Sequence, residues 1–453
     1  MRTTTLKTTT PKTTTRTAGS AVARTGIAIG IASLAGYALL AIVGRSLSPA
    51  EFGLFVAFWG VLFGLGSSLS TIEQEVARQA ARTTDEESGP PAPAVTTAAA
   101  VLGTLVAAVT LVPAVAERLF GQADGWIGLV VTLAALGFAV QFAVRGLLVG
   151  SGDVRSYSWL VIAEAAARLV VLVTILVLFG LELRTAAVAV GVGSYAWLLW
   201  AGRARKVLPH RGLPRATWRA ATGRAASLML GAALIAAVIT GFPTLVTALT
   251  DGSPGAAGGA VFAALTVSRV PLLLISPVQA LAVPFVVRAR ENAATDGASN
   301  LRKGLLLGTA AFAGLGLVAG TIGWAIGPWV VRLVYGPQYD VPRAAIGLLV
   351  LSACLLAWSQ LLSAALIALA AHRRMLLMWG AAVAATVIWL LASPLDVVAT
   401  TAVGALVGPL AALGVGIPAI AALVRPPATL RVADAERRAA RDGTVARRDD
   451  SQS

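Results

Sequence analysis

The chain of 453 residues consists largely of apolar stretches, one after another, separated by short polar connections. About 20 predominantly apolar residues suffice to cross a bilayer as a helix. Hydrophobic residues make up 57% of the chain and charged residues 13%, roughly half the charged fraction of soluble domains. The pattern predicts an all-α membrane protein with about twelve transmembrane helices, at 26–44, 52–72, 94–116, 126–149, 157–180, 184–202, 224–249, 260–287, 303–324, 344–371, 375–393 and 397–424.

The positions of the 36 Lys and Arg residues orient these helices in the membrane. With a cytoplasmic N-terminus, 28 of them fall on cytoplasmic segments, five on outer loops and three inside apolar stretches. Cytoplasmic loops retain Lys and Arg because these charges are not readily moved across the bilayer. An even number of spans then leaves both termini in the cytoplasm. The net charge of +15 is explained by this distribution and does not indicate a nucleic-acid partner.

The longest clearly basic connection, residues 203–223, divides the predicted spans into two sets of six. We therefore expect a first six-helix bundle at 21–202 and a second at 224–424. The Thr-rich segment 1–20 and the mixed-charge segment 425–453 are expected to be disordered cytoplasmic tails, because they offer little apolar surface to bury.

Three arginines lie inside the apolar stretches, where each costs at least about 2.5–3.5 kcal/mol at a span centre unless it faces a cavity, a partner or a substrate. Arg145 is near a span end and could extend to the lipid headgroups instead. Arg168 lies deeper, one turn after Glu164, so these two residues either lock helices together or form the polar wall of a cavity. Arg269 has no acid in its span and needs water, backbone carbonyls or an anion. We predict that Arg269, Arg168, Glu164 and Arg145 bind substrate.

Helix-breaking residues interrupt two of the predicted spans. Gly241 and Pro243 lie in the seventh span, and Pro271, Pro277 and Pro284 lie in the eighth. Each proline removes a backbone donor and kinks a helix. We expect these five positions to act as hinges.

The sequence predicts neither a metal site nor a cofactor. The single cysteine, Cys354, lies in an apolar stretch, and the two histidines, His210 and His372, lie far apart in basic loops. Protein metal sites need several such ligands close together. The outer loops are also too short to contain a catalytic domain. A membrane-embedded polysaccharide polymerase or glycosyltransferase is therefore a minor alternative, as is a purely structural scaffold.

Two segments resemble the bacterial polysaccharide flippases of the multidrug/oligosaccharidyl-lipid/polysaccharide exporter superfamily. In the first, an L-x-P-x-E-F-G turn opens a glycine-rich span, with the motif residues at Leu47, Pro49, Glu51, Phe52 and Gly53. In the second, the sequence YGPQY at 335–339 precedes a long span and a basic turn. The twelve-span layout agrees with this family over roughly residues 20–424.

The resemblance implies two six-helix bundles around a central cavity. It also implies a flippase, not an enzyme, that carries a polyprenyl-diphosphate-linked saccharide to the outer leaflet of the bacterial cytoplasmic membrane by alternating access, for cell-surface polysaccharide biosynthesis. The lipid-linked saccharide and membrane lipids would be its partners, together with polysaccharide assembly proteins. A cationic cavity suits Arg168 and Arg269. The alternative is a cation-coupled multidrug exporter of the same superfamily, and coupling to H+ or Na+ stays open because the first span contains no acid.

Overall fold

The computed structural model describes residues 14–81, 91–122, 124–207, 214–250, 255–270, 272 and 298–423. Within these ranges every regular element is a helix. Eleven of the described helical segments are long and apolar enough to cross a membrane. The predicted fold class, an all-α multi-pass membrane protein, is confirmed.

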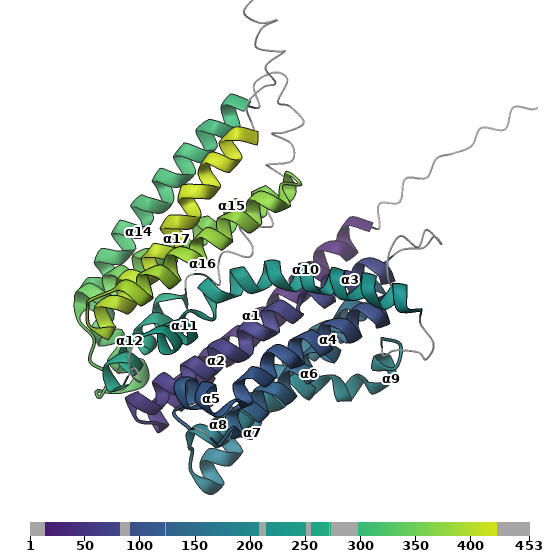
Figure 1. Cartoon of the computed structure of the whole chain (residues 1–453), viewed down its shortest axis with the longest axis horizontal. Helices are drawn as coiled ribbons and strands as arrows, with labels where there is room; N and C mark the ends of the chain where they lie inside the picture. The colour runs from purple at the N-terminus through teal and green to yellow at the C-terminus, as the bar shows by residue number, and fades with distance from the viewer. Residues whose placement is uncertain are drawn as a thin grey trace, which may run out of the picture.

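The chain forms two helical bundles, one from each half of the sequence (Figure 1). The first contains α1 (Thr14–Ser46), α2 (Pro49–Leu69), α3 (Thr71–Ala80), α4 (Ala92–Ala108), the 3-10 turn η1 (Val109–Leu111), α5 (Pro113–Phe120), α6 (Trp126–Gly150), α7 (Val154–Phe179), α8 (Leu183–Val192), η2 (Gly193–Trp200) and α9 (Ala201–Ala204). The second contains α10 (Arg215–Ile239), α11 (Phe242–Leu249), α12 (Gly255–Ser268), α14 (Ala298–Tyr335), α15 (Arg343–Ala368), α16 (His372–Ala392) and α17 (Val397–Leu423).

The two bundles meet at one end and diverge at the other, so the molecule has the shape of a V (Figure 1). At the closed end α2 packs against α11 and α12. The ends that diverge include the start of α1 and the end of α17 (Figure 1). Helix α10 contacts α2 and α4 of the first bundle as well as α16 of the second, so it bridges the two halves.

Large apolar side chains remain exposed over the outside of both bundles. Ile27, Val177, Phe179, Leu307 and Leu377 are each more than 60% exposed. Contiguous apolar surface on this scale marks a contact with lipid or with another protein. A surrounding bilayer accounts for it on helices of this length.

The turn that resembles the flippase motif is a helix start. The Ser48 hydroxyl accepts a hydrogen bond from the Glu51 N–H at 3.3 Å, and the Ser48 N–H donates to Glu51 Oε2 at 3.1 Å. This reciprocal pair is a capping box, and Pro49 occupies the first turn, where its missing N–H costs nothing. The motif therefore fixes where α2 begins.

Several helix boundaries differ from those predicted, those of α1, α10 and α14 among them. Helix α1 begins at Thr14, inside the segment 1–20 predicted to be disordered, and α10 begins at Arg215, inside the predicted connection 203–223. Extending an existing helix adds a hydrogen bond for each residue, so these flanks continue the apolar helices. Helix α14 runs to Tyr335 rather than to 324, because residues 325–335 are themselves mostly apolar.

The seventh span is broken where its sequence predicts. Helix α10 ends at Ile239 and α11 starts at Phe242, with Gly241 between them and Pro243 in the first turn of α11. The carbonyls at the end of α10 are therefore left without helical partners. The eighth span is described only as far as α12 and the residues just after it. The predicted kinks at Pro271, Pro277 and Pro284 lie outside the described residues.

Candidate functional site

A cavity of about 710 Å³ lies between the two bundles. Helices α1, α2, α6 and α7 of the first bundle line one side, and the α10–α11 break, α12 and Gln360 of α15 line the other. All four candidate substrate-binding residues are in its wall, namely Arg145, Glu164, Arg168 and Arg269. These four residues come from α6, α7 and the end of α12, so the fold brings together positions far apart in sequence.

Glu164 joins two of the three buried arginines. Its Oε1 accepts from Arg168 and its Oε2 accepts from Arg145. The side chains of these three residues are only 8–12% exposed. The pairing of Arg168 with Glu164 follows from their spacing on α7. Arg145 could have extended to the lipid headgroups, as its position near a span end suggests. It pairs with this carboxylate instead.

Aromatic rings hold both guanidinium groups in place. The guanidinium carbon of Arg168 lies 4.9 Å from the ring centre of Phe63 and 5.8 Å from that of Phe138. The guanidinium of Arg145 lies 5.4 Å from the ring centre of Phe142. Cations are attracted to such ring faces, more strongly where water is excluded. Arg168 also donates from Nε to the carbonyl of Val190, at 3.2 Å.

A second carboxylate lies beside this cluster and was not among the predicted site residues. Tyr157, which lines the cavity, donates a hydrogen bond to Glu73 of α3. Glu73 also interacts electrostatically with Arg145 and Glu164. Two acids and two arginines thus meet on the first-bundle side of the cavity. The sequence signal was weak, because Glu73 and Tyr157 lie on different spans.

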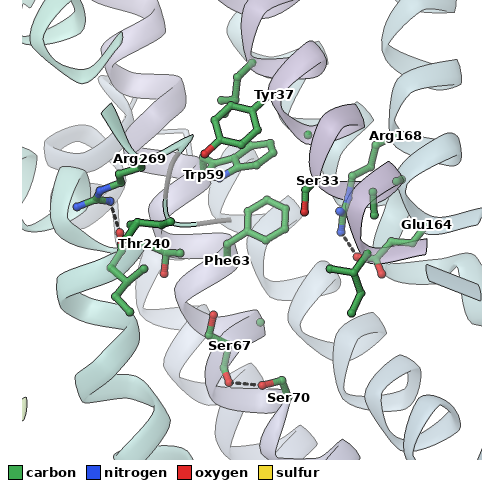
Figure 2. A pocket seen from close by; sticks show the side chains of 18 of the residues that line it. Ser33, Tyr37, Trp59, Phe63, Ser67, Ser70, Glu164, Arg168, Thr240 and Arg269 are labelled. Carbon is green, nitrogen blue, oxygen red and sulfur yellow. Dashed lines mark hydrogen bonds and ion pairs between the residues drawn. The ribbon is translucent and has the colours of Figure 1, made fainter. Parts of the chain in front are cut away.

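Arg269 lies on the opposite wall, across the cavity from Arg168 and Glu164 (Figure 2). It donates from Nη1 to the carbonyl of Ile239, and its Nη2 lies 3.4 Å from the carbonyl of Val238. These are carbonyls freed by the break between α10 and α11. Backbone carbonyls are one of the three partners that the sequence predicts for Arg269, and a cation at a helix C-terminus is also favoured by the helix dipole.

Aromatic rings and hydroxyl groups lie between the two charged walls. Tyr37, Trp59 and Phe63 lie between Arg269 and Arg168 (Figure 2), and the ring centres of Trp59 and Phe63 are 4.2 Å apart. The cavity is also lined by the hydroxyl side chains of Ser33, Ser67, Ser70, Thr240 and Thr266. Ser70, Thr240 and Thr266 already donate to backbone carbonyls, so their oxygens are left as acceptors. The rings of this surface can stack on a ligand.

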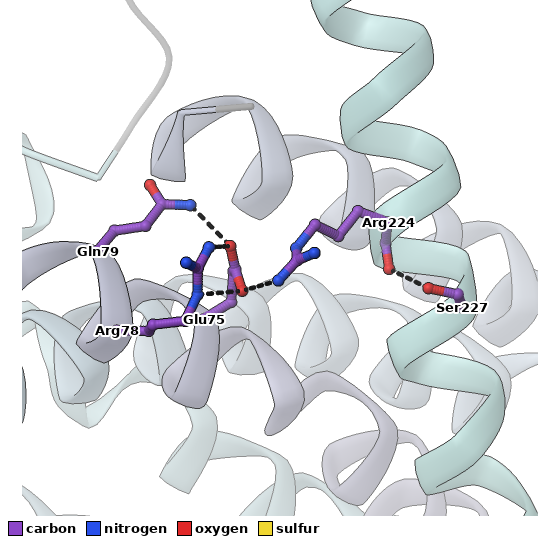
Figure 3. A network of polar contacts seen from close by, with 5 residues as sticks. All are labelled: Glu75, Arg78, Gln79, Arg224 and Ser227. Atoms are coloured by element: carbon purple, nitrogen blue, oxygen red, sulfur yellow. Dashed lines mark hydrogen bonds and ion pairs between the residues drawn. The ribbon is translucent and has the colours of Figure 1, made fainter. Parts of the chain in front are cut away.

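A polar network joins α3 of the first bundle to α10 (Figure 3). Glu75, which is 4% exposed, accepts hydrogen bonds from Arg78, from Gln79 at 2.8 Å and from Arg224 of α10 at 2.9 Å. Arg224 lies in the part of α10 that precedes the break. The network therefore holds this part of α10 on the first bundle, while α10 continues toward the second.

Close backbone contact joins α2 and α12 at the closed end of the V. The Cα of Gly259 on α12 approaches Gly53 of α2 so closely that a Cβ on Gly53 would lie 3.1 Å from it. A Cβ on Gly259 would lie 1.6 Å from the carbonyl oxygen of Pro49. Beside this contact, the Tyr339 hydroxyl donates to the carbonyl of Gly44 at 2.7 Å, across the bundle boundary.

The described residues contain no cluster of three His, Cys, Asp or Glu side chains that could hold a metal ion. Among the described residues that line the cavity, the charged ones are three arginines and one glutamate. The wall carries an excess of positive charge.

Comparison with known proteins places the chain among bacterial relatives. No protein-family model matches it. An uncharacterized protein of Mycobacterium tuberculosis, Rv3630, is 30% identical over 412 residues, which cover 89% of this chain and 93% of the relative. A second uncharacterized M. tuberculosis protein, Rv1510, is 30% identical over 424 residues, covering 89% of this chain and 92% of the relative. The chain belongs to the family of these proteins.

Solved structures show what fold this chain has. An inward-facing multidrug resistance MATE family transporter of the MOP superfamily aligns with a TM-score of 0.65 at 18% identity, covering 90% of this chain and all of that one. The lipid II flippase MurJ in an inward closed conformation aligns with a TM-score of 0.59 at 10% identity, covering 86% of each chain. The chain therefore has the fold of these MOP-superfamily neighbours. Both of these neighbours are transporters or flippases rather than enzymes.

Proposed function

We propose that the chain is a flippase that moves a polyprenyl-diphosphate-linked saccharide precursor across the bacterial cytoplasmic membrane, for cell-surface polysaccharide biosynthesis. The observation that supports this most strongly is the charge of the cavity, whose described lining residues include three arginines and one glutamate. The diphosphate is the part of such a substrate that loses the most hydration energy when it leaves water. Arginine side chains offset this loss through charge-assisted, bidentate hydrogen bonds.

The existing partners of the arginines are ones that an anion can replace. Arg269 is held by neutral backbone carbonyls, and a diphosphate oxygen is a stronger acceptor than a carbonyl. Arg168 and Arg145 share the Glu164 carboxylate and lie close to Glu73, so the positive charge that no carboxylate of the described residues offsets is that of Arg269. The diphosphate would be bound between the two walls, with Arg269 on one side and Arg168 on the other.

The surface between the charged walls suits a saccharide. Sugars present hydroxyl groups and apolar C–H faces, which match the Ser and Thr side chains and the rings of Tyr37 and Trp59. The polyprenyl chain would remain in the bilayer between the halves while the head group crosses.

Alternating access follows from the shape of the molecule. We propose that both termini are cytoplasmic, so that the diverging ends of the bundles face the cytoplasm and the glycine-sealed end faces outward. The better alignment with the inward-facing MATE transporter, with a TM-score of 0.65 against 0.51 for an outward-facing one, supports this. The break at Gly241 and Pro243 would act as the hinge, because Arg224 holds the part of α10 before it on the first bundle. Polysaccharide assembly proteins would supply and receive the substrate.

The alternative, a cation-coupled multidrug exporter, takes its support from the MATE neighbour, which is described as a multidrug resistance transporter. An excess of arginine in the cavity disfavours the binding of cationic drugs. Glu73 and Glu164 are the carboxylates through which H+ or Na+ coupling would act in either case. Drug resistance on expression, with normal surface polysaccharide on deletion, would favour the exporter.

Replacing Arg269 tests the proposed function directly. We expect Arg269→Ala to lower the flux of lipid-linked saccharide to the outer leaflet about 10- to 100-fold, because a hydrogen bond to a charged group contributes about 1.5–3 kcal/mol. Arg269→Lys should keep part of the flux, since it retains the charge but not the planar fork. Arg184→Ala removes an arginine of the surface pair with Asp124 and should leave the flux unchanged. Normal flux in Arg269→Ala at normal expression would refute the role of Arg269.

A further inference from the structure

A second cavity, of about 590 Å³, lies in a groove between α1 and α7, outside the central cavity. It is lined by Ala23, Arg24, Ile27, Ala28, Arg155, Ser158, Trp159 and Ile162. Helices α1 and α7 are the first and fifth crossings, so they run in the same direction. Arg24 lies about three turns into α1 and Arg155 in the first turn of α7, and both line this groove.

Neither arginine of this groove is neutralised within the described part of the chain. Arg24 and Arg155 are exposed and have no ion-pair or hydrogen-bond partner there. The nearest acid in sequence, Asp153, is engaged elsewhere: it accepts from the Ser156 N–H at 3.1 Å and from Arg203 at 3.0 Å. The Ser156 backbone N–H, together with Arg203, holds the pKa of Asp153 below its ordinary value. The groove thus carries two uncompensated positive charges.

The rest of the groove is apolar and extends from the arginines toward the membrane interior. Ile27 is 64% exposed and Trp159 56%, and Ile162 lies one turn beyond. The Ser158 hydroxyl donates to the Val154 carbonyl at 2.9 Å, so it offers no unpaired donor. Positive charge at the membrane face followed by an apolar channel is complementary to a lipid with an anionic head group.

We propose that this groove binds one anionic glycerophospholipid, with its phosphate between Arg24 and Arg155 and an acyl chain along Ile27 and Ile162. Basic pockets between transmembrane helices on the cytoplasmic side bind anionic head groups in this way, and Trp159 is suited to the headgroup level. The bound lipid fills the gap between α1 and α7 and fastens α1 to the first bundle. This site is separate from the substrate cavity and does not depend on which substrate is transported.

Native mass spectrometry of the intact, full-length protein tests the site, with phosphatidylglycerol and phosphatidylcholine offered at equal concentration. We expect the wild type to retain phosphatidylglycerol on the order of tenfold better than phosphatidylcholine. Each of the two arginines near the membrane surface attracts an anionic head group and favours it severalfold. The variant Arg24→Gln/Arg155→Gln should lose this preference. The charge-retaining variant Arg24→Lys/Arg155→Lys should keep it.

The matched control is the variant Arg205→Gln/Arg373→Gln, which removes two exposed arginines outside the groove. It should keep the preference for phosphatidylglycerol. Thermal unfolding without added lipid verifies that each variant is folded. Equal preference in the Arg24→Gln/Arg155→Gln variant and in the control would overturn the proposal. Displacement of bound phosphatidylglycerol by an equal concentration of farnesyl diphosphate would also overturn it, by assigning the groove to the path of a diphosphate-linked substrate.

Discussion

We expect Glu164→Gln to lower the free energy of unfolding by about 3–5 kcal/mol, the cost typical of removing one partner from a buried ion pair. Glu164 is the carboxylate that Arg145 and Arg168 share, and all three side chains are at most 12% exposed. The amide leaves two guanidinium groups close together, with Glu73 as the nearby carboxylate that still interacts with Arg145. Thermal unfolding of the purified protein in detergent measures the effect.

Glu117→Gln is the matched control, because Glu117 is exposed on α5 and its loss should change stability by less than about 0.5 kcal/mol. The variant Glu164→Leu/Arg145→Met/Arg168→Met should recover much of the lost stability, since apolar side chains often replace a buried ion cluster without loss. Equal melting temperatures for Glu164→Gln and Glu117→Gln would contradict a buried, counter-charged cluster.

Glu164→Gln also separates the two interpretations of this cluster, a lock between helices and a wall of the substrate site. If Glu164 only locks α6 to α7, its replacement changes stability and leaves anion binding as it was. If it competes with the substrate for Arg145 and Arg168, its removal raises the affinity for a diphosphate. Binding of farnesyl diphosphate to the folded variant at low temperature distinguishes the two.

The sequence predicts the architecture well because the bilayer imposes it. Every backbone group in the membrane must be satisfied within a helix, so long apolar stretches have one structural solution. The break at Gly241 and Pro243 and the pairing of Glu164 with Arg168 are equally local, and both follow from chemistry within a single span. Helix ends were predicted less well, since α1, α10 and α14 extend beyond their apolar cores.

The cavity could be predicted only in part, because its contacts join different spans. Arg145 and Glu164 are on α6 and α7, and the relative rotation of those helices decides whether Arg145 reaches the acid or the lipid surface. Arg269 finds its carbonyls on α10, so its pairing depends on how α12 packs beside the break. Glu73 and Tyr157 meet for the same reason. The spacing of residues along one helix does not show which side chains on different helices come into contact.

The seal at the closed end of the V depends on Gly259, and we expect Gly259→Ala to open it. The added Cβ would lie 1.6 Å from the Pro49 carbonyl oxygen, which belongs to the backbone and cannot rotate away. Overpacking destabilises the packed conformation by about 1–3 kcal/mol and occasionally more, and a contact with rigid backbone is expected at the upper end. The cost falls only on the conformation in which α2 and α12 touch. A difference of about 3 kcal/mol shifts a two-state equilibrium roughly 100-fold toward the opposite conformation.

A thiol in the cavity reports the opening, because the chain has a single cysteine, Cys354, that can be replaced by serine. In a Ser33→Cys/Cys354→Ser background, a membrane-impermeant maleimide added outside the cell should label position 33 much faster when Gly259→Ala is present. Gly314→Ala is the control, since its Cβ meets nothing within 4 Å. Gly53→Ala, with a milder contact at 3.1 Å, should give an intermediate rate. Unchanged labelling in folded Gly259→Ala would mean that the α2–α12 contact does not gate the cavity, and alternating access would then need another seal.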